Sequence, residues 1–354
     1  MSQSRNGMNV LILYNKVFNY RLPIYEKLAY KHKVDVYYTD GFGLHSKRVN
    51  QHRLKSIKLG PIRIHGMSLF KLAQKYDVVI VFGDIKWLNF SALAFHRSRK
   101  YKLFYWTPGV SASYKKRFDE VKRWDWLRDI IYKRSDGLLF YSSYPVEKYI
   151  ARGYSRERLH VINNTLFVPK YDISKKATRN SFLFIGTLYK QKGIFDILES
   201  YRVQSLGKKS LPILNIIGDG PDFQEALEFI KLNKLESKIF LLGAIYDDLK
   251  KADYFRKAIA VISPFQAGLG VQESFGYGVP FVTRANAITG GERLDIIHGV
   301  NGILLEDVAT LNDLFTNLAQ RQDELYEMGI AGYDFYWENR TIEMMTQQID
   351  LAIS

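Results

Sequence analysis

Near-continuous apolar runs recur along the whole chain, and helical segments separate most of them. In the first half these runs are NVLILYN, VDVYYTD, DVVIVFG, KLFYWT, GLLFYS and LHVIN, and in the second half SFLFIGTL, ILNIIGDG, KIFLLGA, AIAVIS, PFVTRA and GILLED. Such runs are typical of parallel strands that helices cover on both faces. Because 354 residues are too many for one ordinary core, the pattern predicts an α/β protein with two doubly wound, Rossmann-like domains.

Charge divides the chain near its middle. Residues 1–170 carry 32 Lys and Arg against 12 Asp and Glu, a net charge of +20, whereas the remainder has a net charge of −5. Such an asymmetry suggests two domains with different partners. We therefore expect a basic domain at 1–170, a junction around the polar segment Val168–Asn180, and a second domain at 180–332. The remaining segment, 333–354, reads as one helix with Ile342, Met345, Ile349 and Leu351 roughly on one face.

Composition excludes several classes of function. The chain has no cysteine, which removes disulfides, thiol chemistry and cysteine-dependent zinc sites. No window of 18 apolar residues and no signal-peptide pattern occur, so a cytoplasmic protein is expected, with peripheral attachment to the inner face of the plasma membrane as an option. No Asp-x-Asp pair occurs and the histidines are scattered, so we expect no metal and no cofactor.

Three loops of the second half follow strands, and ligands of open α/β sheets bind outside the carboxyl ends of strands. The first offers lysines just before a helix, the second offers glycines that permit close backbone approach, and the third combines glycines with a carboxylate one helical turn later. The donor-binding candidates are Gly186, Thr187, Lys190, Lys192, Gly218, Gly220, Pro264, Gly268, Leu269, Gly270 and Glu273.

Each loop taken alone has a structural reading as well: solvated lysines in a turn, a plain tight turn, and an acid on a helix surface. Together they offer phosphate donors, close backbone approach and an acceptor for a vicinal diol. That combination suits a nucleotide diphosphate sugar.

The same stretches resemble a known family. FIGTLYKQKG, IIGDGP, IFLLGA, SPFQAGLGVQESFGYGVPFV and GVNGILLED, within Ser181–Asp307, are similar to the donor domain of family 4 glycosyltransferases of the GT-B fold. A looser similarity extends to the first half through YNKVFNYRLPIYEKL, FYWTPGV and the stretch from Ser135 to Thr165, which resemble the acceptor domain of bacterial polysaccharide-assembly members.

The resemblance implies roles for individual residues. Lys192 would hold the donor diphosphate and Glu273 the ribose hydroxyls, which makes these two the catalytic candidates, and the two domains would face each other with the terminal helix crossing back to the first. Three positions depart from the family pattern: Thr187 replaces the arginine of Gly-Arg-Leu, Phe265 replaces the first acid of a Glu-x7-Glu pair, and Pro108 replaces a histidine before a glycine.

The resemblance also implies a retaining hexosyltransferase that acts in cell-surface polysaccharide synthesis. A conventional double displacement needs two carboxylates about 5 Å apart, and no such pair accompanies these motifs. A front-face substitution is expected instead, in which the leaving diphosphate takes the acceptor proton and the protein positions both substrates.

The basic half is the expected acceptor side. Its candidate residues follow predicted strands: Asn15, Lys16, Arg21, Asp84, Pro108 and Gly109. Two stretches concentrate the charge, HSKRVNQHRLKSIKLGPIRIH and SYKKRFDEVKRWDWLRDIIYKR, and the second predicts an amphipathic helix around 117–134 that suits an anionic membrane surface or simple packing with a basic edge. A glycan or lipid-linked oligosaccharide acceptor would fit this half.

Other classes of function stay open from the residues alone. One is a nucleotide-sugar epimerase or hydrolase on the same fold, and another is a non-catalytic basic protein that binds a membrane or nucleic acid. Because no nucleic-acid motif is recognisable, no nucleic-acid partner is expected.

Overall fold

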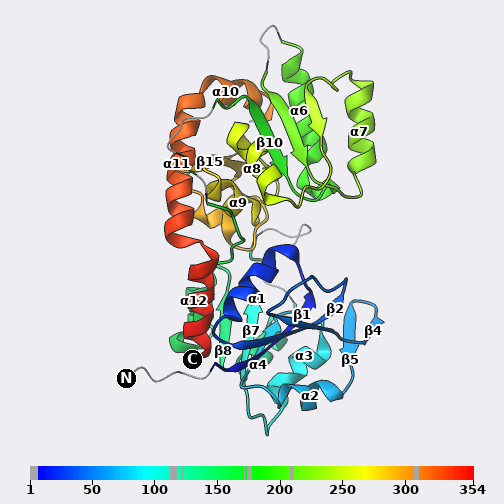
Figure 1. Cartoon of the computed structure of the whole chain (residues 1–354), viewed down its shortest axis with the longest axis vertical. Helices are drawn as coiled ribbons and strands as arrows, with labels where there is room; N and C mark the ends of the chain where they lie inside the picture. Colours follow the sequence, from blue (N-terminus) through cyan, green and yellow to red (C-terminus); the bar gives the residue numbers. More distant parts are fainter. Residues whose placement is uncertain are drawn as a thin grey trace. The chain divides into compact units, whose positions relative to one another are not determined.

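The computed structural model describes residues 7–111, 118–120, 123–170, 172–173, 178–207, 211–306 and 311–354. The chain separates into two compact units, each drawn in Figure 1. Unit 1 comprises Met1–Ser111, Glu120–Phe167 and Ile342–Ser354, and unit 2 comprises Ala112–Asp119 and Val168–Thr341. The C-terminal segment therefore belongs to the first unit.

A parallel sheet of seven strands forms the centre of unit 1 in the order β3-β2-β1-β6-β7-β8-β9. Its strands are β1 (Asn9–Lys16), β2 (Lys33–Asp40), β3 (Asn50–Arg53), β6 (Val78–Phe82), β7 (Lys102–Thr107), β8 (Gly137–Phe140) and β9 (Leu159–Val161). The six apolar runs of the first half all became strands of this sheet. Both faces are covered because alternate residues of each run enter opposite cores, as Leu11 and Leu13 do on one side and Val10 and Ile12 on the other.

Apolar periodicity did not predict three short strands. They are β3 and a separate antiparallel hairpin of β4 (Ser56–Leu59) and β5 (Ile62–His65), visible in Figure 1 as its own small sheet. In sequence this region is a basic stretch, and its few apolar residues alternate with charged ones, which leaves no continuous apolar run.

Helices cover both faces of the first sheet. They are α1 (Leu22–Leu28), α2 (Ser68–Ala73), α3 (Leu88–Ala92), α4 (Asp125–Tyr132), α5 (Pro145–Ala151) and α12 (Ile342–Ile353), with single 3-10 turns η1 (Asn19–Arg21), η2 (Leu93–Phe95) and η3 (Arg156–Arg158). The C-terminal helix α12 buries Ile342, Met345, Ile349 and Ile353 against α1 and the sheet. Leu351, which was expected on the same face, is exposed.

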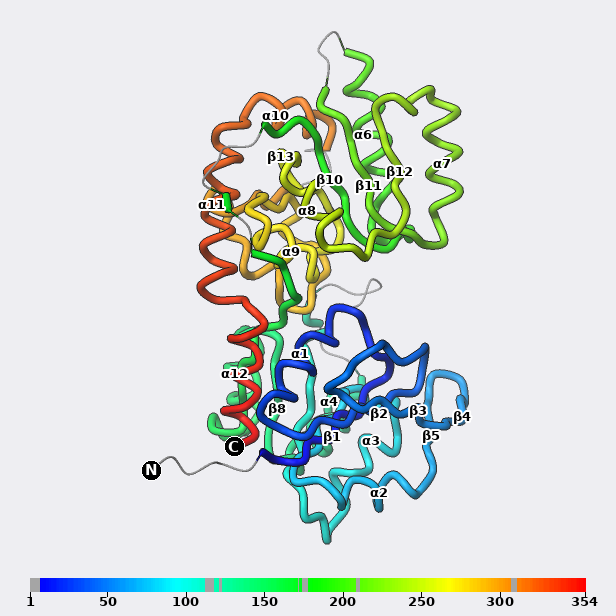
Figure 2. Tube along the Cα trace, viewed as in Figure 1, coloured from blue at the N-terminus to red at the C-terminus, as the bar shows by residue number. Residues whose placement is uncertain are grey.

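Unit 2 contains a six-stranded parallel sheet in the order β12-β11-β10-β13-β14-β15, and Figure 2 shows β10, β11 and β12 running side by side. The strands are β10 (Ser181–Ile185), β11 (Ile213–Ile217), β12 (Ile239–Leu241), β13 (Ala258–Ile262), β14 (Phe281–Arg284) and β15 (Gly302–Leu305). Each coincides with one of the predicted apolar runs.

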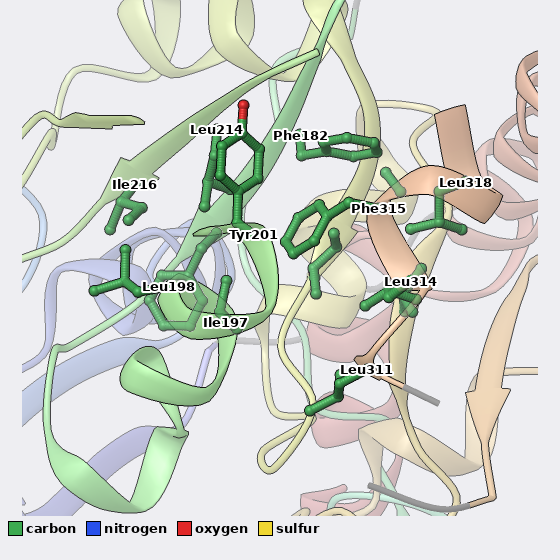
Figure 3. Packing of buried hydrophobic residues seen from close by; sticks show 14 of the residues in the cluster. Phe182, Ile197, Leu198, Tyr201, Leu214, Ile216, Leu311, Leu314, Phe315 and Leu318 are labelled. Carbon is green, nitrogen blue, oxygen red and sulfur yellow. The ribbon is translucent and has the colours of Figure 1, made fainter. Parts of the chain in front are cut away.

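The helices of unit 2 are α6 (Ile194–Ser205), α7 (Phe223–Leu232), α8 (Asp248–Lys257), α9 (Gly270–Gly276), α10 (Leu314–Gln320) and α11 (Gln322–Asn339), with η4 (Lys190–Lys192) and η5 (Glu292–Asp295). Strand and helix side chains form its core together, as Figure 3 shows for Phe182 and Leu214 beside Tyr201 and Phe315. The Tyr201 hydroxyl leaves this core to donate to the Pro212 carbonyl at 2.9 Å, so the ring is buried without an unpaired polar atom.

Two expected helices differ from the structure. The prediction of one helix over 333–354 was wrong: α11 ends at Asn339 and α12 begins at Ile342. Arg340 lies at this break and forms a two-pronged ion pair with Asp295 at 2.6 and 2.9 Å, so a tertiary contact holds the chain where the helices separate.

The amphipathic helix expected around 117–134 is also shorter than predicted. Among the described residues of that stretch, only α4, Asp125–Tyr132, is helical, because Asp119 has a left-handed φ of 57° that a right-handed helix cannot contain. Phe118 lies in a turn, and residues 113–117 and 121–122 of the basic stretch lie outside the described residues.

Candidate active site at the carboxyl edge of the second sheet

The strand order of unit 2 reverses direction between β10 and β13. Chain connections leave these neighbouring strands toward opposite sides, which opens a crevice at their carboxyl ends where ligands of doubly wound sheets bind. The segment Gly186–Gly193 follows β10, and the segment Ser263–Leu269 follows β13. The first and third predicted loops therefore lie next to each other, at the position where doubly wound sheets bind ligands.

The loops after β10 and β11 pack backbone against backbone. Gly186 donates its N–H to the Ile217 carbonyl and Leu188 donates to the Asp219 carbonyl, both at 2.9 Å. A Cβ atom on Gly218 would stand 1.9 Å from the Gly186 carbonyl oxygen, and one on Gly220 would stand 2.2 Å from the Leu188 oxygen. The glycines of the second loop thus permit its close packing on the first loop, and their proximity to a ligand stays a prediction.

We expect the substitution Gly218→Ala to destabilise unit 2 and to displace the loop that carries Lys192. The new methyl group would overlap a backbone carbonyl, and overpacking of this kind costs roughly 1–3 kcal/mol. Gly268→Ala is the matched control, since nothing lies within 4 Å of a Cβ at Gly268. Thermal unfolding of both variants checks this, and equal melting temperatures would contradict the packing role.

Lys192 lies at the end of η4, beside the backbone of Gly186. Its Nζ is 2.3 Å from the position of a Cβ on Gly186, so the ammonium group occupies the space that the glycine leaves open. Nζ also lies 5.9 Å from the centre of the Tyr189 ring. In the described part of the chain no acid pairs with Lys192, and burial lowers its pKa to about 8. The ammonium group of Lys192 is thus half-buried without an acidic partner among the described residues. Lys190 and Thr187 are exposed nearby.

Glu273 lies in α9, three residues beyond the end of the glycine loop. It is 8% exposed, so the reading as a helix surface acid is wrong. Lys251 of α8 donates to its Oε1 at 2.7 Å and pairs with Asp248 at 2.9 Å. Both acids raise the pKa of Lys251 against the effect of burial. Lys251 was not predicted, because nothing in the local pattern of α8 distinguishes it from the other lysines there.

Phe265, which replaces the expected first acid, packs into the crevice. Its ring would stand 2.1 Å from a Cβ on Gly193, the left-handed residue before α6, so this glycine is needed both for φ = 69° and for space. The guanidinium of Arg284 lies 5.2 Å from the ring centre, and Gln266 beside it accepts from the Tyr189 hydroxyl at 2.8 Å. Arg284 ends β14, so the rule about strand ends would have found it.

The glycine loop itself follows Pro264, whose carbonyl accepts from the backbone N–H of Arg284 at 3.1 Å. Gly268, Leu269 and Gly270 are half-buried at the start of α9. Within the ranges that the structure describes, no group of His, Cys, Asp or Glu side chains is arranged to hold a metal ion.

The acceptor-side candidates of unit 1 follow the carboxyl ends of three neighbouring strands. Asn15 and Lys16 end β1, Asp84 follows β6, and Pro108 and Gly109 follow β7, so the sheet brings them to one edge. Asp84 accepts from the backbone N–H of Lys86 at 3.1 Å, a local contact within the turn after β6.

Arg21 differs from the other candidates because it is 1% exposed. Its guanidinium lies 4.4 Å from the centre of the Trp106 ring and donates to the Tyr141 hydroxyl at 2.8 Å. It is therefore a buried cation between aromatic rings.

Two Rossmann-like units in one chain, with the last helix packed on the first, define the GT-B class of fold. Residues 179–321 match the family model of the glycosyl transferases group 1. The similarity to that group therefore lies within unit 2. The match covers the three loops described above.

Solved structures share the whole fold at low identity. HepE from Anabaena, in complex with UDP and glucose, is 15% identical with a TM-score of 0.70, covering 97% of this chain and 98% of its own. The lipopolysaccharide outer core galactosyltransferase WaaB is 19% identical with a TM-score of 0.66, covering 98% and 99%. Sucrose-phosphate synthase from Thermosynechococcus elongatus is 16% identical with a TM-score of 0.68, covering 97% of each chain. No curated protein sequence matches the chain.

Proposed function

We propose that this protein transfers a hexose-type sugar from a nucleotide diphosphate sugar to a glycan or lipid-linked acceptor, with retention of configuration and without a metal ion. The observation that carries this proposal is Lys192, a cation with no acidic partner in the described chain, placed where the strand order of unit 2 reverses. Structures of the same fold in complex with UDP, UDP and glucose, or UDP-glucose support a nucleotide sugar as the donor.

Lys192 is the group that faces the donor diphosphate. Negative charge on the diphosphate grows as the bond to the sugar breaks, so a neighbouring ammonium group stabilises the transition state more than the bound substrate. Lys190 is exposed on the same turn and adds positive charge near it.

Glu273 accepts hydrogen bonds from the ribose hydroxyls. A carboxylate has room for several hydrogen bonds, so its contact with Lys251 leaves capacity for a diol. Lys251 acts through Glu273: its ion pair holds the carboxylate in one orientation before the donor arrives, which lowers the entropic cost of binding.

Retention by a front-face substitution fits the composition of the loops. Phe265 occupies the position of the first acid of the Glu-x7-Glu pair, so this loop and the start of α9 hold one carboxylate, Glu273, and not two. In this reaction the acceptor hydroxyl attacks the anomeric carbon, the bond to the diphosphate oxygen breaks, and that oxygen takes the hydroxyl proton. The protein needs to position both substrates and to stabilise the leaving group.

The acceptor is proposed to meet unit 1, whose segments contribute most of the basic residues. A lipid-linked oligosaccharide or an acidic glycan in cell-surface polysaccharide synthesis would complement this charge, and an anionic membrane surface would attract it. Every helix within the described ranges is too short or too polar to cross a bilayer, so the attachment proposed is peripheral.

A thermal-shift panel of UDP, GDP, ADP and their sugars tests the donor. A nucleotide that binds stabilises the folded state by roughly 2.7 kcal/mol at 100 times its Kd, and we expect one base to stand out. Incubation of the preferred nucleotide sugar with acceptor glycans should then give a glycoside in the presence of EDTA. Release of free sugar at the same rate without acceptor would indicate a hydrolase, and loss of activity that magnesium restores would contradict metal independence.

A further inference from the structure

The hairpin β4–β5 exposes aliphatic side chains to solvent. Cross-strand pairs place Ile57 opposite Ile64 and Leu59 opposite Ile62, so these four aliphatic side chains share one face. Ile57 is 65% exposed and Leu59 is 57% exposed. The apolar face of a hairpin ordinarily packs on the core, yet here its β4 side chains are exposed, while Ile62 and Ile64 of β5 are half-buried.

The opposite face of the hairpin is polar and anchored. It carries Ser56 opposite His65 and Lys58 opposite Arg63. His65 is buried and exchanges a hydrogen bond of 2.9 Å with Thr39 of β2, while burial lowers its pKa to about 4 and keeps it neutral. The backbone of Arg63 donates to the Lys86 carbonyl at 2.9 Å. The main body of unit 1 therefore holds the hairpin with its aliphatic side outward.

A basic cavity of about 540 Å³ lies on the polar side of the hairpin, between it and the ends of β2 and β3. Arg53, Lys55 and Arg63 line it against a single acid, Asp40, which pairs with Arg63 at 2.8 Å. In the described part of the chain neither Arg53 nor Lys55 forms an ion pair. The cavity thus offers two free cations to an anionic group.

We propose that the hairpin β4–β5 is the element that docks this protein on an anionic lipid surface. The exposed aliphatic side chains Ile57 and Leu59 enter the interface, and the exposed cations Arg53 and Lys55, which line the cavity beside the hairpin, hold a headgroup phosphate. Aliphatic side chains beside Lys and Arg suit a lipid interface, whereas a nucleic acid offers little to the aliphatic face. A second copy would bring together two surfaces of the same strong positive charge. The inference rests on the proposed peripheral attachment and names the part of the chain responsible.

Flotation of the full chain with vesicles tests the docking face. Wild type should float with phosphatidylcholine–phosphatidylglycerol vesicles and float poorly with phosphatidylcholine alone. The double variant Ile57→Ser, Leu59→Ser should lower the partition coefficient at least tenfold, since two exposed aliphatic side chains lose their transfer to the interface. Arg53→Gln with Lys55→Gln should lower it roughly tenfold for anionic vesicles only. The matched control, Leu232→Ser with Leu249→Ser, removes two exposed leucines of unit 2 and should float as wild type.

Three outcomes would overturn the inference. In the first, the hairpin variant floats as well as wild type. In the second, Trp126→Ser, which removes an exposed aromatic side chain of α4, abolishes flotation while the hairpin variant still floats. Sedimentation could also reveal a dimer that only the hairpin variant loses, with no flotation of wild type. Thermal shifts with UDP separate this test from the proposal about the donor. Hairpin variants that keep the UDP shift but lose flotation support the docking face. Hairpin-dependent flotation of a protein that shows no UDP shift would support the docking face and contradict UDP as the nucleotide of the donor.

Discussion

Lys192→Ala is expected to lower kcat by roughly 10²–10³-fold, the usual consequence of removing one group that stabilises developing charge. The donor Kd should change much less, because the charge on the leaving diphosphate is largest in the transition state. Among the described residues, no Asp or Glu forms an ion pair with Lys192, so the substitution removes no structural ion pair. Steady-state kinetics with the nucleotide sugar, beside donor binding by calorimetry, separates the two effects.

Lys190→Ala is the matched control for this variant, since Lys190 is exposed on the same turn. We expect Lys190→Ala to lower kcat far less than Lys192→Ala does.

The pH dependence of kcat/KM gives a second check. In the proposed reaction the ammonium form of Lys192 holds the diphosphate, and burial lowers the pKa of this group to about 8. The kcat/KM of wild type should therefore be full below pH 8 and fall as pH rises through that value. The kcat/KM of Lys192→Ala should not show this fall above pH 8. If the substitution changed KM alone, Lys192 would contribute to binding and not to the chemical step.

Glu273→Ala is expected to weaken nucleotide binding about ten- to a hundredfold, because a lost hydrogen bond to a charged group costs roughly 1.5–3 kcal/mol. The variant also leaves Lys251 with one acidic partner, Asp248, instead of two. Part of its effect should therefore appear as a lower melting temperature. Calorimetric titration of the folded variant measures the loss of affinity directly.

Two further variants distinguish a ligand from a structural ion pair. Glu273→Gln keeps the shape and some hydrogen bonding and should keep more affinity than Glu273→Ala. Lys251→Met removes the ion pair but not the diol acceptor, so it should lower the melting temperature while costing less affinity than Glu273→Ala. If Glu273→Ala and Lys251→Met shift stability equally and neither changes donor affinity, Glu273 is structural.

The sheets of both units were predictable from the sequence because their strands are buried on both faces. A run such as KLFYWT has to be apolar at every position when helices cover the sheet, and β7 occupies those six residues. The same reasoning did not find the short strands β3, β4 and β5, since polar residues such as Asn50 and Lys58 are exposed there and leave no continuous apolar signal.

The sequence by itself determined which loops hold candidate residues, since Lys192 and Glu273 follow apolar runs that could only be strands. Tertiary structure alone decided which loops meet. The order β12-β11-β10-β13 brings the segments after β10 and β13 together although the helices α6, α7 and α8 and the strands β11 and β12 lie between β10 and β13 in the sequence. It also decided what the side chains contact: Glu273 pairs with Lys251 of α8, and Arg21 is enclosed by aromatic rings. Local patterns record burial and periodicity, but partners distant in sequence are chosen by strand order and packing.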